Sequence, residues 1–75
     1  MNITDIMIHV HPELSAEQRE HIEQEISSLD GIVSVHFSPQ HHQELNIAYN
    51  PEAVNSTTIL SMVRQWDQDA VMAGL

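Results

Sequence analysis

The chain has 75 residues, six histidines, no cysteine and 11 acidic side chains against only two fixed cations, which gives a formal net charge of −9. A chain of this length makes one domain, residues 1–75, and its charge argues against nucleic acid and anionic membranes as partners. Without cysteine it has no disulfides and no thiolate metal site, so a metal would need histidine, carboxylate or methionine ligands.

The first predicted element is a half-buried strand over residues 3–11, because apolar and polar side chains alternate along it. Its core face carries Ile6, Ile8 and Val10. Its exposed face carries Asp5, Met7, His9 and His11. Two polar residues break the apolar run and no cationic segment precedes it, so we predict no signal peptide or membrane span and expect a cytoplasmic protein.

The next element is an amphipathic helix over residues 15–29. Its apolar face holds Ile22, Ile26 and Leu29. The sequence S-A-E-Q at its start predicts a capping box, in which the Ser15 hydroxyl accepts from the backbone of Gln18 and the Gln18 side chain returns to the backbone of Ser15. The following Asp30 and Gly31 are expected to end the helix, with Gly31 in the left-handed conformation.

Two further strands, residues 32–38 and 44–50, form a predicted hairpin. Their inward side chains are Val33, Val35, Phe37, Leu45, Ile47 and Tyr49. A second helix follows, and Asn55 is its predicted N-cap. Its apolar face holds Ile59, Met62, Val63 and Trp66, so we expect Trp66 in the core. Residues 70–75 predict a short terminal strand.

This order of elements favours an α+β, ferredoxin-like βαββαβ sandwich, with a four-stranded antiparallel sheet and two helices on one face. The expected strand order is four-one-three-two, and the other face of the sheet is bare. Its polar side chains include His9 and His11 on the first strand and His36 on the second, and Asn46 and Ala48 of the third strand lie between them.

Three framework motifs run through most of the chain: I-E-x-x-I-x-x-L-x-G-I-x-S-V from Ile22 to Val35, Y-N-P-E-x-V from Tyr49 to Val54, and Ile59 and Val63 in the helix that follows. In these motifs the chain resembles the heavy-metal-associated domains of copper chaperones and metal-pumping ATPases. The resemblance implies the ferredoxin-like fold and a metal-handling role without enzymatic activity.

The family's metal-binding motif, M-x-C-x-x-C, is missing from this chain. In the family its two thiolates lie in the loop that enters the first helix and clasp Cu(I), Zn(II) or a similar ion. Counting back from Gly31 without gaps places the methionine at Glu13 and the cysteines at Ser15 and Gln18. Hydroxyl and amide oxygens are poor ligands for soft ions, and the capping box already explains Ser15 and Gln18. The fold is therefore expected without its thiolate site.

His9, His11 and His36 are the predicted metal ligands. The first two are two residues apart on one strand, with Cα atoms about 6.6 Å apart, so their rings can converge on one ion at about 2.0 Å. His36 would lie on the order of 10 Å away and lean over Asn46 and Ala48 to complete the site. Three imidazoles suit Zn(II), Cu(II) or Ni(II) better than Cu(I).

Other interpretations stay open for these histidines. They are also explained as polar residues on a solvated sheet face, or as part of a homodimer surface on that face. His41 and His42 lie in the predicted hairpin loop, where adjacent imidazoles can bind an ion weakly. By the resemblance, Asp67 and Asp69 fall near the loop end of the domain, where they could support His11.

Two functional hypotheses follow. The first is a non-enzymatic, metal-handling domain with a histidine site for a divalent ion. The second is a metal-free interaction or oligomerisation module, whose acidic surface favours a basic protein partner such as a metal transporter domain. No phosphate-binding loop or nucleophile motif supports an enzyme.

Overall fold

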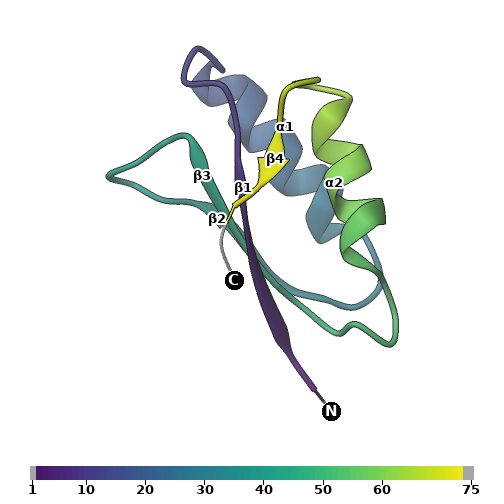
Figure 1. Ribbon diagram of the computed structural model, residues 1–75. Helices are drawn as coiled ribbons and strands as arrows, with labels where there is room; N and C mark the ends of the chain where they lie inside the picture. The colour runs from purple at the N-terminus through teal and green to yellow at the C-terminus, as the bar shows by residue number, and fades with distance from the viewer. Residues whose placement is uncertain (1, 74–75) are drawn as a thin grey trace.

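The structure is a computed structural model that describes residues 2–73. Its elements follow in the order β1 (Thr4–His9), α1 (Ala16–Ser27), β2 (Ile32–Phe37), β3 (Glu44–Tyr49), α2 (Ser56–Arg64) and β4 (Val71–Met72). The strands form one antiparallel sheet in the order β2-β3-β1-β4, and both helices lie on the same face (Figure 1). The predicted α+β ferredoxin-like sandwich and its strand order are confirmed.

The core lies between the helices and one face of the sheet. Its buried side chains are Ile6, Ile8, Val10, Ile22, Ile26, Leu45, Ile47, Tyr49, Ile59, Val63 and Ala70. Partly buried apolar side chains, Trp66 among them, pack against this cluster, and no polar side chain is buried within residues 2–73. In β1 and β3 every second side chain points to the core, as the alternation predicted, so the opposite face keeps polar groups.

Each helix begins at a side-chain cap. The Ser15 hydroxyl accepts from the backbone N–H of Gln18 at 3.1 Å, and Gln18 Oε1 accepts from the backbone N–H of Ser15 at 2.8 Å. Asn55 Oδ1 accepts from the backbone N–H of Thr58 at 2.8 Å. Both predicted caps are confirmed, and each satisfies donors that the first turn of a helix leaves free. Within the described part of the chain, neither helix is long and apolar enough to cross a membrane.

Gly31 has positive φ, +94°, but it does not cap α1. The helix ends at Ser27 with Ser28 as its C-cap in right-handed conformation, so the prediction that the Asp30 and Gly31 pair ends the helix is wrong. Gly31 instead lies where the chain enters β2 against the turn after β3, and its carbonyl accepts from the backbone N–H of Asn50 at 2.7 Å. Its role is to allow a close approach between these two segments.

A β-bulge at the start of β2 corrects a second prediction. Val33 was expected to point inward, but it is 59% exposed, whereas Ile32 packs against the core. The pairing shifts between Ile32 and Ser34, so that two residues oppose one on β3. Beyond this extra residue, Val35 and Phe37 return to the partly buried face as predicted.

The last strand is shorter than residues 70–75. β4 contains only Val71 and Met72, paired with His9 and Ile8 of β1. The backbone N–H of Ala73 also donates to the carbonyl of Met7 at 2.9 Å. The remainder of the predicted strand, residues 74–75, lies outside the described residues.

Candidate functional site

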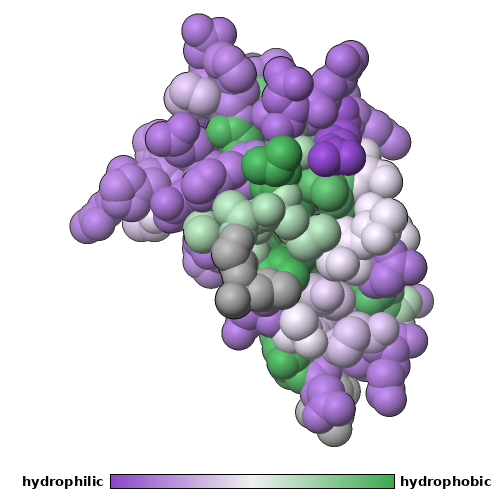
Figure 2. All heavy atoms as spheres, viewed as in Figure 1, coloured by the Kyte–Doolittle hydropathy of each residue, from purple (hydrophilic) through white to green (hydrophobic). Residues whose placement is uncertain are grey.

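A hollow of about 320 Å³ lies where β1 leaves the sheet and α1 begins. It is lined by His11, Glu13, Leu14, Gln18, Trp66 and Asp67. These residues come from the loop after β1, the first turn of α1 and the loop after α2, which the fold brings to one end of the domain (Figure 1). Hydrophilic residues cover this end and the β2–β3 hairpin, while hydrophobic residues gather around β4 (Figure 2).

His11 is anchored at this hollow by its main chain and its ring. Its backbone N–H donates to Asp67 Oδ2 at 2.7 Å, so Asp67 lies beside His11 as expected, whereas Asp69 contacts Asp67. Its Nδ1 accepts from the backbone N–H of Glu13 at 3.3 Å and lies 3.8 Å from Glu13 Oε2. The other Asp67 oxygen accepts from the backbone N–H of Asp69 at 3.0 Å. An imidazole and two carboxylates therefore line the same hollow, but Asp67 contacts the main chain of His11 and not its ring.

The first turn of α1 contributes no free ligand pair to the hollow. The resemblance places the family's cysteines at Ser15 and Gln18. The side-chain oxygens of these two residues accept the hydrogen bonds of the capping box. A soft ion such as Cu(I) prefers thiolates, so these two side chains do not fit it. Their observed contacts support the capping explanation of both residues.

Trp66 forms an apolar wall of the same hollow. Its indole N–H donates to Glu25 Oε2 at 3.1 Å, and its ring centroid lies 5.7 Å from that of His21 at an interplanar angle of 31°. The ring is partly buried and packs against the core, as predicted. As the single tryptophan of the chain, it is a fluorescent reporter beside His11.

The open face of the sheet is built from cross-strand rows. One row holds Asp5, Ala48 and Ser34, and the next holds Met7, Asn46 and His36. His9 lies one row further on, opposite Glu44 and beside Val71. The register therefore offsets His9 from His36 by one row and pairs each with a different neighbour.

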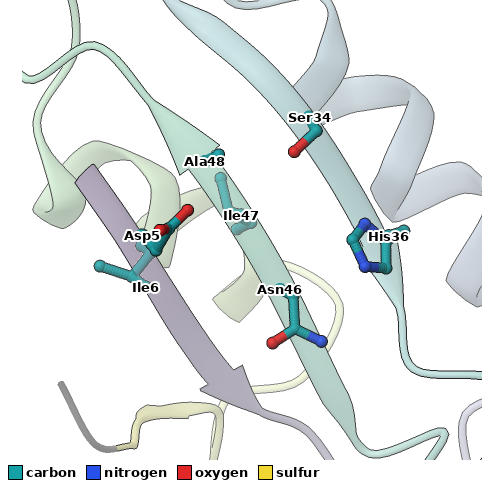
Figure 3. A pocket seen from close by; sticks show the side chains of 7 residues that line it. All are labelled: Asp5, Ile6, Ser34, His36, Asn46, Ile47 and Ala48. Atoms are coloured by element: carbon teal, nitrogen blue, oxygen red, sulfur yellow. The ribbon is translucent and has the colours of Figure 1, made fainter. Parts of the chain in front are cut away.

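A smaller hollow of about 130 Å³ lies on this face around the small side chain of Ala48. Figure 3 shows its polar lining from three strands: Asp5 on β1, Asn46 on β3, and Ser34 and His36 on β2. Ile6 and Ile47 complete the lining. This open-face hollow is separate from the hollow at His11.

The structure does not bring the three predicted metal ligands together. His11 lines the hollow at the β1–α1 loop, His36 lines the open-face hollow, and His9 lines neither. The expected shared face of His9 and His11 is lost because β1 ends at His9 and a turn begins after His11. Across residues 2–73, no group of three or more histidine, aspartate or glutamate side chains is arranged to hold a metal ion.

Both fixed cations of the chain are used within the fold. Arg19 Nη1 donates to the carbonyl of Leu14 at 2.6 Å, and Arg64 Nε donates to the carbonyl of Ala70 at 2.9 Å. In the described part of the chain, the only basic side chain close to a carboxylate is His11, whose Nδ1 lies 3.8 Å from Glu13 Oε2, and the two form an ion pair only when the imidazole is protonated. Most carboxylates therefore face solvent without a cation nearby, which makes the surface strongly anionic.

Sequence reasoning missed two features of these sites. Trp66 was expected in the core, and its second role as a wall of the His11 hollow depends on loops that meet only in the fold. Glu44 lies opposite His9, and this neighbour of a predicted ligand depends on the strand register. Neither feature leaves a local spacing signal in the sequence.

Comparison with known proteins identifies the fold. No family model matches the sequence, and no curated protein matches it. Among solved structures, oxidized MerP from Ralstonia metallidurans CH34 is similar with a TM-score of 0.74 at 7% identity, over 96% of each chain. A proposed copper-ion-binding protein from Bacillus anthracis str. Ames is similar with a TM-score of 0.77 at 12% identity, over 96% of this chain and 97% of that one. The chain has the heavy-metal-associated type of fold. At these identities the likeness establishes the fold alone.

Proposed function

We propose that this chain is a non-enzymatic, metal-handling domain that binds a borderline divalent ion, Zn(II), Ni(II) or Cu(II), at the hollow beside His11. The observation that carries the proposal is that the imidazole of His11 and the carboxylates of Glu13 and Asp67 line one hollow at the loop that enters α1. Imidazole and carboxylate ligands suit borderline divalent ions and disfavour Cu(I).

The contacts of His11 support Nε2 as the metal ligand. Nδ1 accepts from the backbone N–H of Glu13, so Nε2 is the ring nitrogen without a contact to Glu13. An ion at Nε2 would place the proton on Nδ1, break that hydrogen bond, and let the Glu13 carboxylate, 3.8 Å away, move closer to accept the proton. A carboxylate that orients a metal-bound histidine in this way is a common outer-shell partner. Because no three ligands are preformed within residues 2–73, binding requires side-chain movement, so we expect it to be weak and reversible.

His9 and His36 remain secondary candidates in this proposal. His9 is two residues before His11, so a change in the loop can bring its ring toward the same ion. His36 lies on a different strand and lines a different hollow, so we expect its removal to have the smaller effect.

The test is a nitrogen-15 NMR titration with Zn(II) and Ni(II), together with Trp66 fluorescence during a Cu(II) titration. We expect saturable shifts centred on His11, and quenching of Trp66 by Cu(II). The variant His11→Ala should weaken binding by about tenfold or more, equivalent to about 1.4 kcal/mol. His42→Ala removes an imidazole from the exposed hairpin loop and is the matched control.

Two results would reject this site. One is the absence of saturable shifts at His11 at micromolar metal. The other is an equal loss of affinity in His11→Ala and His42→Ala, because this would indicate weak binding by any surface imidazole. Separate variants His9→Ala and His36→Ala then rank the remaining candidate ligands.

A second candidate function, favoured by the charge distribution, is docking to a basic protein such as a metal transporter domain. Both arginines donate to main-chain carbonyls of their own chain, so the exposed carboxylates are largely uncompensated. Such a surface speeds and orients association with a cationic partner. We expect binding to a hexa-arginine peptide to weaken steeply as salt is raised from low to physiological concentration.

A further inference from the structure

We propose that the open-face hollow around Ala48 receives an arginine side chain of a basic partner protein. The proposal deepens the docking function above and rests on it. It concerns the exposed sheet face, on the side opposite the helices, and involves none of the residues that line the His11 hollow.

The size of the hollow indicates what can enter it. Its volume of about 130 Å³ corresponds to roughly four water molecules at about 30 Å³ each. Pockets for whole small molecules are usually about 300–1,000 Å³. The hollow therefore suits the end of one side chain. Ala48 provides this space, because a larger residue at the centre of the row would fill it.

The lining of the hollow is rich in hydrogen-bond acceptors. Asp5 supplies a carboxylate, Ser34 a hydroxyl and Asn46 an amide oxygen, and His36 borders them (Figure 3). Asp5 is exposed and forms no ion pair among the described residues. The group that fits this lining is a cation with several N–H donors.

A guanidinium matches the lining better than an ammonium. It is planar and always charged, and its fixed fork of donors can bind a carboxylate through two parallel hydrogen bonds. With Asp5 at one side and Asn46 in the neighbouring row, one guanidinium can bond to the carboxylate and still offer a donor to the amide oxygen. A lysine ammonium can contact the same oxygens only as a point charge.

The charge of the chain argues for a different protein as the partner. A second copy would bring Asp5 and Glu44 of its own open face, and its only guanidiniums are already bonded to the carbonyls of Leu14 and Ala70. Association of two open faces would therefore bring like charges together. A basic partner brings the opposite charge to the same surface.

The experiment follows backbone amide shifts of the nitrogen-15-labelled chain during titration with N-acetyl-argininamide. N-acetyl-citrullinamide is the neutral control of nearly the same shape. We expect saturable shifts at the residues of the hollow with the arginine probe alone. Asp5→Asn should weaken binding about three- to fivefold, as expected for an exposed ion pair. Ala48→Leu should abolish the shifts by filling the space.

Asp30→Asn is the matched charge control, because Asp30 is exposed and lies in the segment between α1 and β2, outside the hollow. An equal response to the citrulline probe, equal weakening by Asp30→Asn and Asp5→Asn, or full binding by Ala48→Leu would overturn the proposal. So would concentration-dependent shifts at these positions without any probe, since they would assign the face to a second copy.

A hexa-arginine peptide separates this inference from the docking function. If the peptide shifts only the backbone amides of the acidic residues of α1, the docking function stands and the proposal for the hollow is rejected. No salt-dependent shifts anywhere would reject both. The Zn(II)-induced shifts at His11 should be the same in Asp5→Asn as in the unchanged chain. This would show that the variant is folded and that the metal site does not depend on the open-face hollow.

Discussion

Gly31 provides the sharpest test of the packing between the start of β2 and the turn after β3. A Cβ on Gly31 would lie 2.7 Å from the Cβ of Ala53 and 3.3 Å from a methyl of Val54, at a backbone φ of +94°. For Gly31→Ala the positive φ costs about 1–2 kcal/mol and the overpacking about 1–3 kcal/mol. We therefore expect a loss of about 2–5 kcal/mol in the free energy of unfolding.

Urea unfolding at 25 °C, followed by circular dichroism, can separate these two contributions. Ala53→Gly removes the contact partner and alone should cost about 0.5–1 kcal/mol. In the double variant the overpacking disappears and the strain from φ remains. The loss of unfolding free energy in the double variant should therefore be smaller than the sum of the two single losses by about 1–3 kcal/mol. Additivity within about 0.5 kcal/mol would refute the close approach between residues 31 and 53. A loss below about 1 kcal/mol in Gly31→Ala would refute the strain argument.

Two other side-chain contacts lead to simple stability predictions. Ser15→Ala removes the hydroxyl half of the capping box and should lower the free energy of unfolding by about 1 kcal/mol, or the melting temperature by about 4–8 °C. The control is Ser61→Ala, at an exposed position within α2, which should leave the stability unchanged. The carboxylate of Glu23 accepts from the backbone N–H of Phe37, on the outer strand β2, at 2.8 Å. Glu23→Ala should therefore lower the free energy of unfolding in urea by about 1–2 kcal/mol, and Glu23→Gln should retain most of the stability. If Glu23→Gln loses as much as Glu23→Ala, the hydrogen bond is not the cause.

The sequence was sufficient to predict the fold because its apolar spacing and caps agree with each other. Alternation identified the core faces of β1 and β3, and the S-A-E-Q motif identified the start of α1. It was not sufficient at the start of β2, because a bulge adds a residue without breaking the apolar pattern. Ile32 and Val33 are both β-branched, so alternation alone could not tell which of them faces the core.

The candidate sites were less predictable because they depend on register and on contacts between distant loops. Spacing placed His9 and His11 on one face, but β1 ends at His9 and His11 turns toward Asp67, which is 56 residues away in the sequence. The separation of His36 from His9 follows from the pairing of β2 with β3, since His36 lies beside Asn46 and His9 beside Glu44. No local pattern carries this information.

The identity of the two fixed cations, which both bond to main-chain carbonyls, also has a practical chemical consequence. The two fixed cations are arginines, so the chain has no side-chain primary amine. A reagent that activates carboxyl groups for attack by amines therefore cannot link one side chain of this protein to another. In a mixture with a lysine-containing partner, each such side-chain bond would run from a carboxylate of this chain to a lysine of the partner. Mapping those bonds would identify which acidic residues lie at the interface.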